Sequence, residues 1–386
     1  MTERSFFAIF ENLEDPRNDK GKKYPLLDVI ILAIYGTLCG YTDFSNMAYY
    51  LKYREDELIK KLGLETGVPS HDVFSDVFRL LDVEKFMDLF ALWVRQIIRE
   101  KSGKHVAIDG KAVRGAARKA LKGNIPYVIS AYMCDNGLSI GQKEVGAKTN
   151  EITEIPKLLD LIDISGCTVT IDAIGTQKAI MDKIVSKGGH YCLQLKKNQR
   201  AAFEGVELHF EDIMSDNRRK PEPYIQVEKD HGRIEKRTYY TISNEEDIRA
   251  IVPEGWDSVH CIGMAVLERE VNGEKTCEKH FHVMDVERTA EEYAQLARGH
   301  WGIENSQHWV LDVIFGEDKS TAREDGAISN LTLMRKIAFN FAKMVPGEEK
   351  KSTKKRITDF MMDIELFKTL IYEVYPIQKL AEKQNG

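Results

Sequence analysis

Apolar side chains recur at helical spacing through the first hundred residues. Leu26 and Ile30 follow this spacing in one segment, and Val73 and Val77 follow it in a second. Apolar residues at every third or fourth position form one face of an amphipathic helix. The pattern therefore predicts a mostly helical N-terminal domain over residues 1–100.

The pattern changes to short apolar runs from residue 105 onward. Strand-like runs alternate with helical segments as far as residue 219. This succession is the βαβ signature of an α/β sheet covered by helices. Within it, Asp135, Asn136 and Gly137 supply turn residues that tolerate positive φ, which predicts a hairpin between the two flanking strands.

Alternating strand patterns dominate residues 220–287, and helical spacing returns after them. Thr289 and Glu292 have the spacing of a capping box, so one long helix is expected to begin there. Glu304 lies about 100° from the apolar stripe of this helix, and so at the edge of the core. The stripe is formed by Leu296, Ile303, Val310 and Ile314.

The composition is that of an ordinary globular protein of two or three domains. Of 386 residues, 30% are charged and 43% are hydrophobic, and the net charge is -6. An acidic total disfavours wholesale release of counterions from nucleic acid. A nucleic-acid partner would therefore have to bind through local basic patches.

The chain shows none of the sequence features of a membrane or secreted protein. The longest weakly polar run, residues 29–42, is shorter than the roughly 20 residues that a membrane helix needs, and it is expected to form a buried helix. The N-terminus lacks the basic start and cleavage site of a signal peptide. Six cysteines without a C-x-x-C pair favour buried free thiols over disulfides or zinc. We expect a cytoplasmic protein.

Two predicted strands each run directly into an aspartate, Asp109 in VAIDGKAVRG and Asp172 in TVTIDAIGTQ. A carboxylate at the end of a buried strand is costly unless a cation or hydrogen bonds stabilise it. Each aspartate alone could cap a turn. If the two strands are neighbours, paired carboxylates favour divalent ions, because Mg²⁺ and Mn²⁺ take oxygen ligands and two such ions about 4 Å apart can promote phosphoryl displacement.

A third acid is expected on the long helix. His300, Glu304 and His308 recur every four residues and share one face of the predicted helix, with a tryptophan after each histidine. A solvated helix face rarely has this composition, so Glu304 is the candidate third ligand. Asp312, at the start of DVIFGED, is its rival.

Several motifs resemble, in order along the chain, those of the H-repeat-associated proteins, which are bacterial insertion-sequence transposases of the DDE type. They are EDPRNDKGKKYPLLDVIILAIYG, AIDGKAVRG, AKTNEITEIPKLL, VTIDAIGTQ, LQLKKNQ, DHGRIEKR and RGHWGIENSQHWVLDVIFGED. The resemblance implies an RNase H-like mixed sheet flanked by helices. It implies a helical, DNA-binding N-terminal domain at 1–100, the catalytic domain at 104–219 and 288–345, a β-rich insertion at 220–287 and a C-terminal helical tail at 346–386.

The resemblance also implies the chemistry. By position, Asp109, Asp172 and Glu304 are the three catalytic acids, and they hold two Mg²⁺ or Mn²⁺ ions. The implied reaction is metal-dependent cleavage at the ends of the element, followed by DNA strand transfer. The implied partners are double-stranded DNA, as the element's terminal inverted repeats and as target DNA, and a second copy of the chain in a homodimer.

One departure from the related pattern concerns the residues around the third acid. Many related transposases have Y-x2-R-x3-E-x6-K there. At the Tyr, Arg and Lys positions this chain has Ala297, His300 and Leu311, so only Glu304 matches. The hairpin-forming cleavage route of those relatives is therefore not carried over, although His300 could still contact phosphate.

Local basic and polar groups are expected to contact DNA on either side of the cleavage site. One cluster follows the first aspartate and another ends a strand of the same predicted sheet. Residues 118–122 could instead form a solvated basic turn, and residues 350–356 are more typical of an exposed link than of a DNA-binding arm. The predicted contacts are Lys111, Arg114, Lys196, Lys197, Gln199, His231, Arg233, His300 and Asn305.

The sequence leaves a second function open, that of a DNA-binding remnant of an insertion element which keeps the fold without transposing. The loss of one acid would favour this function, and all three acids are present. An assay of strand transfer would separate the two functions, because the remnant would bind DNA without turning it over.

Overall fold

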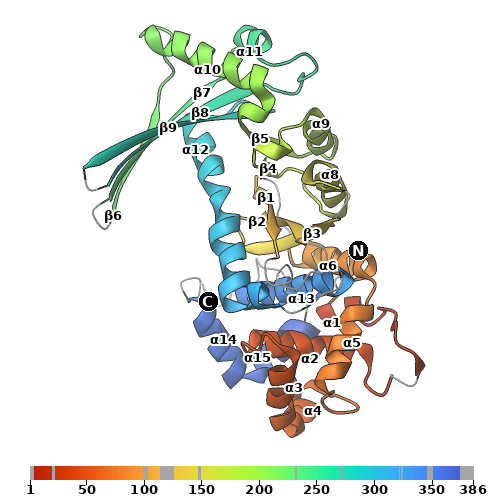
Figure 1. Ribbon diagram of the computed structural model, residues 1–386. Coiled ribbons are helices and arrows are strands. Elements are labelled where there is room, and N and C mark those ends of the chain that lie inside the picture. The colour runs from red at the N-terminus through yellow and green to blue at the C-terminus, as the bar shows by residue number, and fades with distance from the viewer. Residues whose placement is uncertain are drawn as a thin grey trace. The chain divides into compact units, whose positions relative to one another are not determined.

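The computed structural model divides into two compact units (Figure 1). Unit 1 comprises residues 1–100, 110–150 and 304–386, and unit 2 comprises residues 101–109 and 151–303. The residues that the structure describes are 4–19, 22–98, 103–113, 126–146, 149–230, 233–271, 273–320, 322, 325–345 and 351–373.

Unit 1 is mainly helical, and this confirms the helices predicted in its first hundred residues. Phe6 and Phe341 pack against Trp93, with ring centroids 5.3 and 5.0 Å from that of the indole. All three side chains are almost fully buried, so helices from both ends of the chain share one core. The helices are α1 (Phe6–Phe10), α2 (Leu26–Leu38), α3 (Phe44–Tyr53), α4 (Glu55–Leu62), α5 (His71–Leu80), α6 (Val83–Ile97), α13 (Asp325–Lys343), α14 (Thr353–Met362) and α15 (Ile364–Tyr372).

The apolar run that the sequence assigns to a buried helix forms α2, whose residues from Val29 to Leu38 are all buried. It packs against α13 and α5 in the core of unit 1. No helix in the described part of the chain has both the length and the apolar content of a membrane span.

The predicted hairpin of unit 1 is confirmed. Strands β2 (Tyr127–Met133) and β3 (Leu138–Val145) pair in antiparallel fashion. Gly137 in the connecting turn has φ 69°, a left-handed conformation that glycine adopts without strain. The last residues of β1 (His105–Ala112) also belong to unit 1, because the boundary between the units falls after Asp109.

Unit 2 is built on a mixed sheet, which confirms the predicted α/β class. Its described strands lie in the order β1-β4-β5-β9-β8-β7-β6. Strands β1, β4 and β5 are parallel, and the pairs from β5 to β6 are antiparallel. The strands after β1 are β4 (Thr168–Ile171), β5 (His190–Leu195), β6 (Tyr224–Asp230), β7 (Arg233–Ile242), β8 (Cys261–Val271) and β9 (Glu274–Met284).

The helices of unit 2 cover both faces of this sheet (Figure 1). Helices α8 and α9 pack side by side near β4 and β5, while α12 contacts β5, β7 and β8 from the other side. Phe210 on α10 stacks on Phe281 of β9 with ring centroids 5.9 Å apart. The five helices are α8 (Glu151–Leu161), α9 (Lys178–Ser186), α10 (Arg200–Ser215), α11 (Glu245–Ile251) and α12 (Ala290–Gly299).

The long helix predicted from Thr289 is not regular over its whole length. Its start is confirmed, since Thr289 and Glu292 form the capping box of α12. The helix ends at Gly299, and two π-helical segments follow, Ile303–His308 (η4) and Val310–Ile314 (η5). The wider turn of a π-helix changes which side chains share a face.

The three residues predicted to share one helix face differ in exposure, since Glu304 is exposed whereas His308 is only 8% exposed. The common face of His300, Glu304 and His308 stays a prediction.

Candidate active site

Asp109 and Asp172 come directly after the last paired residues of two neighbouring strands. Asp172 follows the end of β4, whereas β1 continues through Asp109 to Ala112, so the predicted strand end at Asp109 is wrong. Strands β1 and β4 pair in parallel, and their last matched residues are Ile108 and Ile171. Each aspartate directly follows one of these isoleucines, so the two lie at adjacent positions at one edge of unit 2. Both side chains are partly exposed. The condition set by the sequence for paired carboxylates, that the two strands be neighbours, is therefore met.

The turn after β4 uses one oxygen of Asp172 as a cap. Asp172 Oδ1 accepts a hydrogen bond from the backbone N–H of Ile174 at 3.2 Å and so begins the short 3₁₀ helix Ala173–Gly175 (η2). In the described part of the chain, Oδ2 accepts no hydrogen bond. Capping and cation binding are therefore compatible functions of this carboxylate.

The loop after β5 braces the turn that carries Asp172. Asn198 Nδ2 donates to the carbonyl of Ala173 at 2.7 Å, and Gln199 Nε2 donates to the carbonyl of Thr176 at 2.9 Å. The side chain of Gln199, which the sequence suggests as a DNA contact, therefore holds the turn beside the aspartate in this structure. Lys196 and Lys197 precede these residues and are exposed.

A glycine follows each aspartate at a place where the backbone is closely packed. A Cβ atom on Gly110 would lie 2.3 Å from the ring of Tyr127 in unit 1, and one on Gly175 would lie 2.4 Å from Cγ2 of Ile171 in unit 2. Cβ atoms do not approach other heavy atoms so closely, so a side chain at Gly110 in β1 or at Gly175 in η2 would force its neighbour to shift. Pattern analysis gives no account of these glycines, because the close contacts come from tertiary packing.

Replacing Gly175 by alanine should destabilise the protein by about 1–3 kcal/mol, the range expected for overpacking a well-packed site. The new methyl group would push against Ile171, which is 3% exposed and ends β4. Urea unfolding of Gly175→Ala and of Gly146→Ala measures the effect, since a Cβ on Gly146 would meet only ordinary contact at 3.5 Å. Equal stability of the two variants would contradict close packing at the Asp172 turn.

A chain of hydrogen bonds links β1, β4 and the end of α12. The hydroxyl of Thr170 bonds to Nε2 of His105 at 2.7 Å and to Nδ1 of His300 at 2.9 Å. Burial, followed by the positive charge of Lys196, lowers the pKa of His300 to about 4. His300 is therefore neutral at pH 7, and it holds the C-terminal end of α12 against β4, close in sequence to Asp172.

Glu304 belongs to unit 1, in the π-helical segment η4, and both Glu304 and the adjacent Asn305 are exposed. The structure thus brings Asp109 and Asp172 together within unit 2, while Glu304 follows His300 by four residues along the chain. Among the described residues, no three His, Cys, Asp or Glu side chains are grouped closely enough to hold a metal ion.

Comparison with known proteins identifies the family. The model described as Transposase DDE domain matches residues 100–341, and the model described as DDE_Tnp_1-associated matches residues 7–94. The chain belongs to the DDE transposase family. The resemblance deduced from the motifs is confirmed, and the matched domain of this transposase contains Asp109, Asp172 and Glu304.

Relatives of this transposase match nearly its full length. It is 30% identical over 361 residues to "Putative transposase YncI" of Escherichia coli O157:H7, covering 92% of each chain. It is 30% identical over 332 residues to "H repeat-associated putative transposase YhhI" of Escherichia coli (strain K12), covering 85% of this chain and 87% of the relative. A piggyBac transposase synaptic complex with hairpin DNA aligns over 93% of this chain and 76% of its own, with 11% identity and a TM-score of 0.42.

Two of the basic groups that the sequence assigns to DNA are engaged with carboxylates. Lys111 is only 15% exposed, and its ammonium group donates to Asp312 and Glu317. Arg233 donates to Glu235 on the same strand. Two further predicted DNA contacts, Arg114 and His231, lie outside the described residues.

The rival third ligand, Asp312, is thus already paired with a lysine. Burial raises the pKa of Asp312 although the lysine opposes this effect. The sequence does not indicate that Glu317 is the second partner of Lys111. A glutamate in the FGED motif is typical of a solvated turn, but Glu317 is only 2% exposed.

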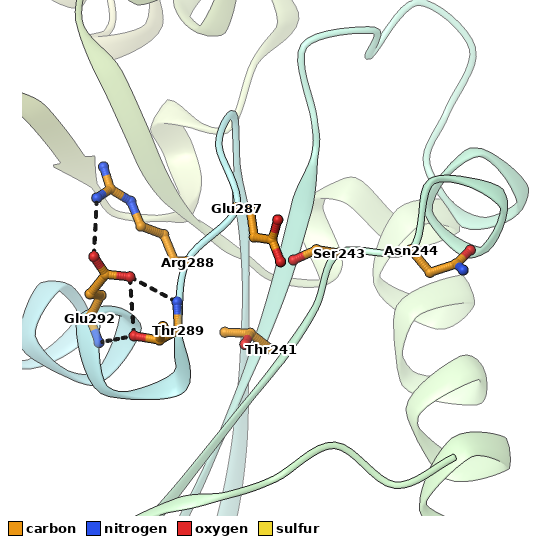
Figure 2. A pocket seen from close by; sticks show the side chains of 7 residues that line it. All are labelled: Thr241, Ser243, Asn244, Glu287, Arg288, Thr289 and Glu292. Atoms are coloured by element: carbon orange, nitrogen blue, oxygen red, sulfur yellow. Dashed lines mark hydrogen bonds and ion pairs between the residues drawn. The ribbon is translucent and has the colours of Figure 1, made fainter.

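The transposase also contains a polar cavity, whose lining residues are distant from Asp109 and Asp172 in the sequence (Figure 2). Several of these residues form hydrogen bonds. Thr289 and Glu292 use their side chains in the capping box, and Arg288 donates to Thr168. None of the predicted acids lines the cavity, so it gives no support for a second catalytic centre. Its lining residues are Thr241, Ser243, Asn244, Glu287, Arg288, Thr289 and Glu292.

Proposed function

We propose that this transposase cleaves DNA at the ends of its element in a metal-dependent reaction and transfers the freed strand to target DNA, on an RNase H-like catalytic core. The observation that carries the proposal is the register of β1 and β4, which puts Asp109 and Asp172 at adjacent positions directly after the last paired residues, within unit 2. Adjacent carboxylates repel one another, and a bound cation relieves that repulsion.

The donor set fits Mg²⁺ or Mn²⁺. Carboxylate oxygens are the ligands that these hard cations prefer. Asp109 and Asp172 would supply them, and Oδ2 of Asp172 accepts no hydrogen bond from the residues that the structure describes. We assign Glu304 as the third acid, because His300, one helical turn earlier in the chain, is bonded to Thr170 on β4. Two bound ions would activate the attacking oxygen and stabilise the leaving one.

In the first step, water attacks the phosphodiester at the element end, the bond from phosphorus to the 3′ oxygen breaks, and a 3′-hydroxyl is left. In the second step, that hydroxyl attacks a target phosphodiester, and the target's own 3′ oxygen leaves. Asp109, Asp172 and Glu304 would hold the cations, which would supply electrostatic positioning of the reacting phosphate, and positioning of this kind supplies most of the rate in phosphoryl transfer.

The DNA contacts are assigned to groups near these acids. Lys196 and Lys197 are exposed at the end of β5, the strand beside β4, so they can neutralise phosphates near Asp172. Asn305 lies next to Glu304, and His300 contributes a neutral hydrogen-bonding group. We assign recognition of the inverted repeats to the helical residues 1–100. We further propose that two copies of the chain act together, one at each end of the element.

Wild-type protein should convert oligonucleotides that carry the element's inverted repeats into nicked and strand-transferred products when Mg²⁺ or Mn²⁺ is present. Chelation by EDTA should stop the reaction and leave binding in a gel-shift assay. Products are resolved on denaturing gels with end-labelled strands. Tight binding without product at any concentration of either metal would refute the proposal and support the DNA-binding remnant.

A further inference from the structure

A buried ion cluster in unit 1 joins the end of β1 to the segment after the π-helical turns. The ammonium group of Lys111 donates to Asp312 Oδ1 and to Glu317 Oε2, the latter at 2.5 Å. The side chains of Lys111, Asp312 and Glu317 are 15%, 24% and 2% exposed. Such shielding from solvent makes ion pairs sensitive to the loss of either partner.

The lysine and Glu317 remain charged in this cluster. Burial alone would lower the pKa of Lys111, but Glu317 and Asp312 raise it above its usual value. Burial would raise the pKa of Glu317, but Lys111 and the buried Lys336 and Arg335 on α13 hold it below its usual value. The carboxylate of Glu317 therefore lies among basic groups from two elements, β1 and α13, although burial lowers the pKa of Lys336 to about 7.

The cluster fixes a segment whose own backbone is irregular. Asp312 lies in η5, and Glu317 begins the 3₁₀ helix Glu317–Lys319 (η6). Arg335 Nε adds a further tether, because it donates to the carbonyl of Phe315 at 3.1 Å. Residues 303–319 are thus held from outside at three points, at Asp312, Phe315 and Glu317.

We propose that Lys111 is a positioning residue that ties residues 303–319 to β1 and thereby sets where the carboxylate of Glu304 lies. The expected effect of this tether on catalysis rests on the proposed function, but the existence of the tether does not. Lys111 follows Asp109 by two residues on β1, so one strand carries the first acid and also holds the segment of the third. A phosphate contact by Lys111, suggested by the sequence, would require its ammonium group to leave both carboxylates.

The test compares Lys111→Gln with Lys111→Arg, which keeps the positive charge. Lys368→Gln serves as the matched control, because Lys368 pairs with Glu365 at 3.9 Å on the surface of the same unit. For Lys111→Gln we expect kcat to fall by about 10- to 100-fold, the scale of a displacement near 1 Å, with KM for DNA unchanged. Lys111→Arg should restore most of kcat, and Lys368→Gln should match wild type.

Hydrogen exchange followed by mass spectrometry gives a readout that needs no catalysis. Peptides within residues 303–319 should exchange faster in Lys111→Gln, while peptides of α2 keep their protection. This local loosening would separate a tether from a general loss of stability. If Lys111→Gln does not fold, Asp312→Asn removes one arm of the tether and should loosen the same peptides.

Two results would overturn the inference. Unchanged exchange in residues 303–319 would show that Lys111 does not hold the segment. A raised KM with unchanged kcat would show that Lys111 contacts DNA instead. If wild type makes no product, the proposed function fails, but the exchange experiment still decides whether the tether exists.

Discussion

Replacing Asp109 or Asp172 by asparagine should abolish product, with a fall in rate of roughly 10³-fold or more, equivalent to about 4 kcal/mol of transition-state stabilisation. Asparagine keeps the size of the side chain but removes the charge that holds a divalent cation. For Asp172 the comparison is especially clean, because an asparagine oxygen can still accept from Ile174 N–H and cap η2. Single-turnover cleavage of end-labelled oligonucleotides measures the loss.

The matched control for these variants is Asp182→Asn on α9. Asp182 is an exposed aspartate of the same unit that pairs with Lys178 at 2.7 Å, and its loss should leave the rate near that of wild type. Gel-shift affinity should persist in all three variants, because the assigned phosphate contacts Lys196 and Lys197 are intact. Full activity in Asp109→Asn would mean that the reaction uses another site.

The strands that precede the two aspartates could be predicted because their sequences are continuous apolar runs. Buried parallel strands have this composition, since both of their faces are covered. The runs ending at Ile108 and Ile171 are such strands. The sequence alone then places one aspartate directly after each run. Whether the two aspartates are adjacent depends only on whether the two strands are neighbours.

The pattern of the sequence could not predict how the β-rich insertion at residues 220–287 joins the sheet. The sequence gives four strands between residues 220 and 287, and the structure contains β6, β7, β8 and β9 there. Strand β9 pairs with β5, so the insertion extends the same sheet. Strand periodicity reports which face of a strand is buried, but it carries no information about which edge the strand joins.

The irregular segment around Glu304 could not be predicted for a related reason. Local spacing favours one continuous helix, and the contacts that accompany the π-helical turns are made with residues far away in sequence. Lys111 and its partners Asp312 and Glu317 are an example. A lysine after an Asp-Gly pair has the appearance of a solvated group, and only the tertiary structure shows that it is buried between carboxylates.

Lowering the pH from 7 to 4 should destabilise unit 2 through two buried histidines. Burial is the main cause that lowers the pKa of His282 to about 3 and of His300 to about 4, and nearby positive groups add to it. In the unfolded chain a histidine titrates near about 6.5. Between pH 6.5 and the folded pKa the unfolded state binds more protons, so stability falls as the pH falls through this window.

His300→Asn tests this prediction, because asparagine can still bond to Thr170 but does not titrate in this range. The variant should lose about 2–3 kcal/mol of the pH-dependent change in unfolding free energy between pH 6.5 and 4, as measured by urea unfolding at several pH values. The control is His71→Asn on α5, whose side chain is 58% exposed. A pH dependence that is unchanged in His300→Asn would show that folding does not lower the pKa of His300. The salt dependence of DNA binding gives a second measurement, because a charged His300 in contact with DNA predicts a shallower dependence in the variant, whereas a neutral His300 predicts an unchanged one.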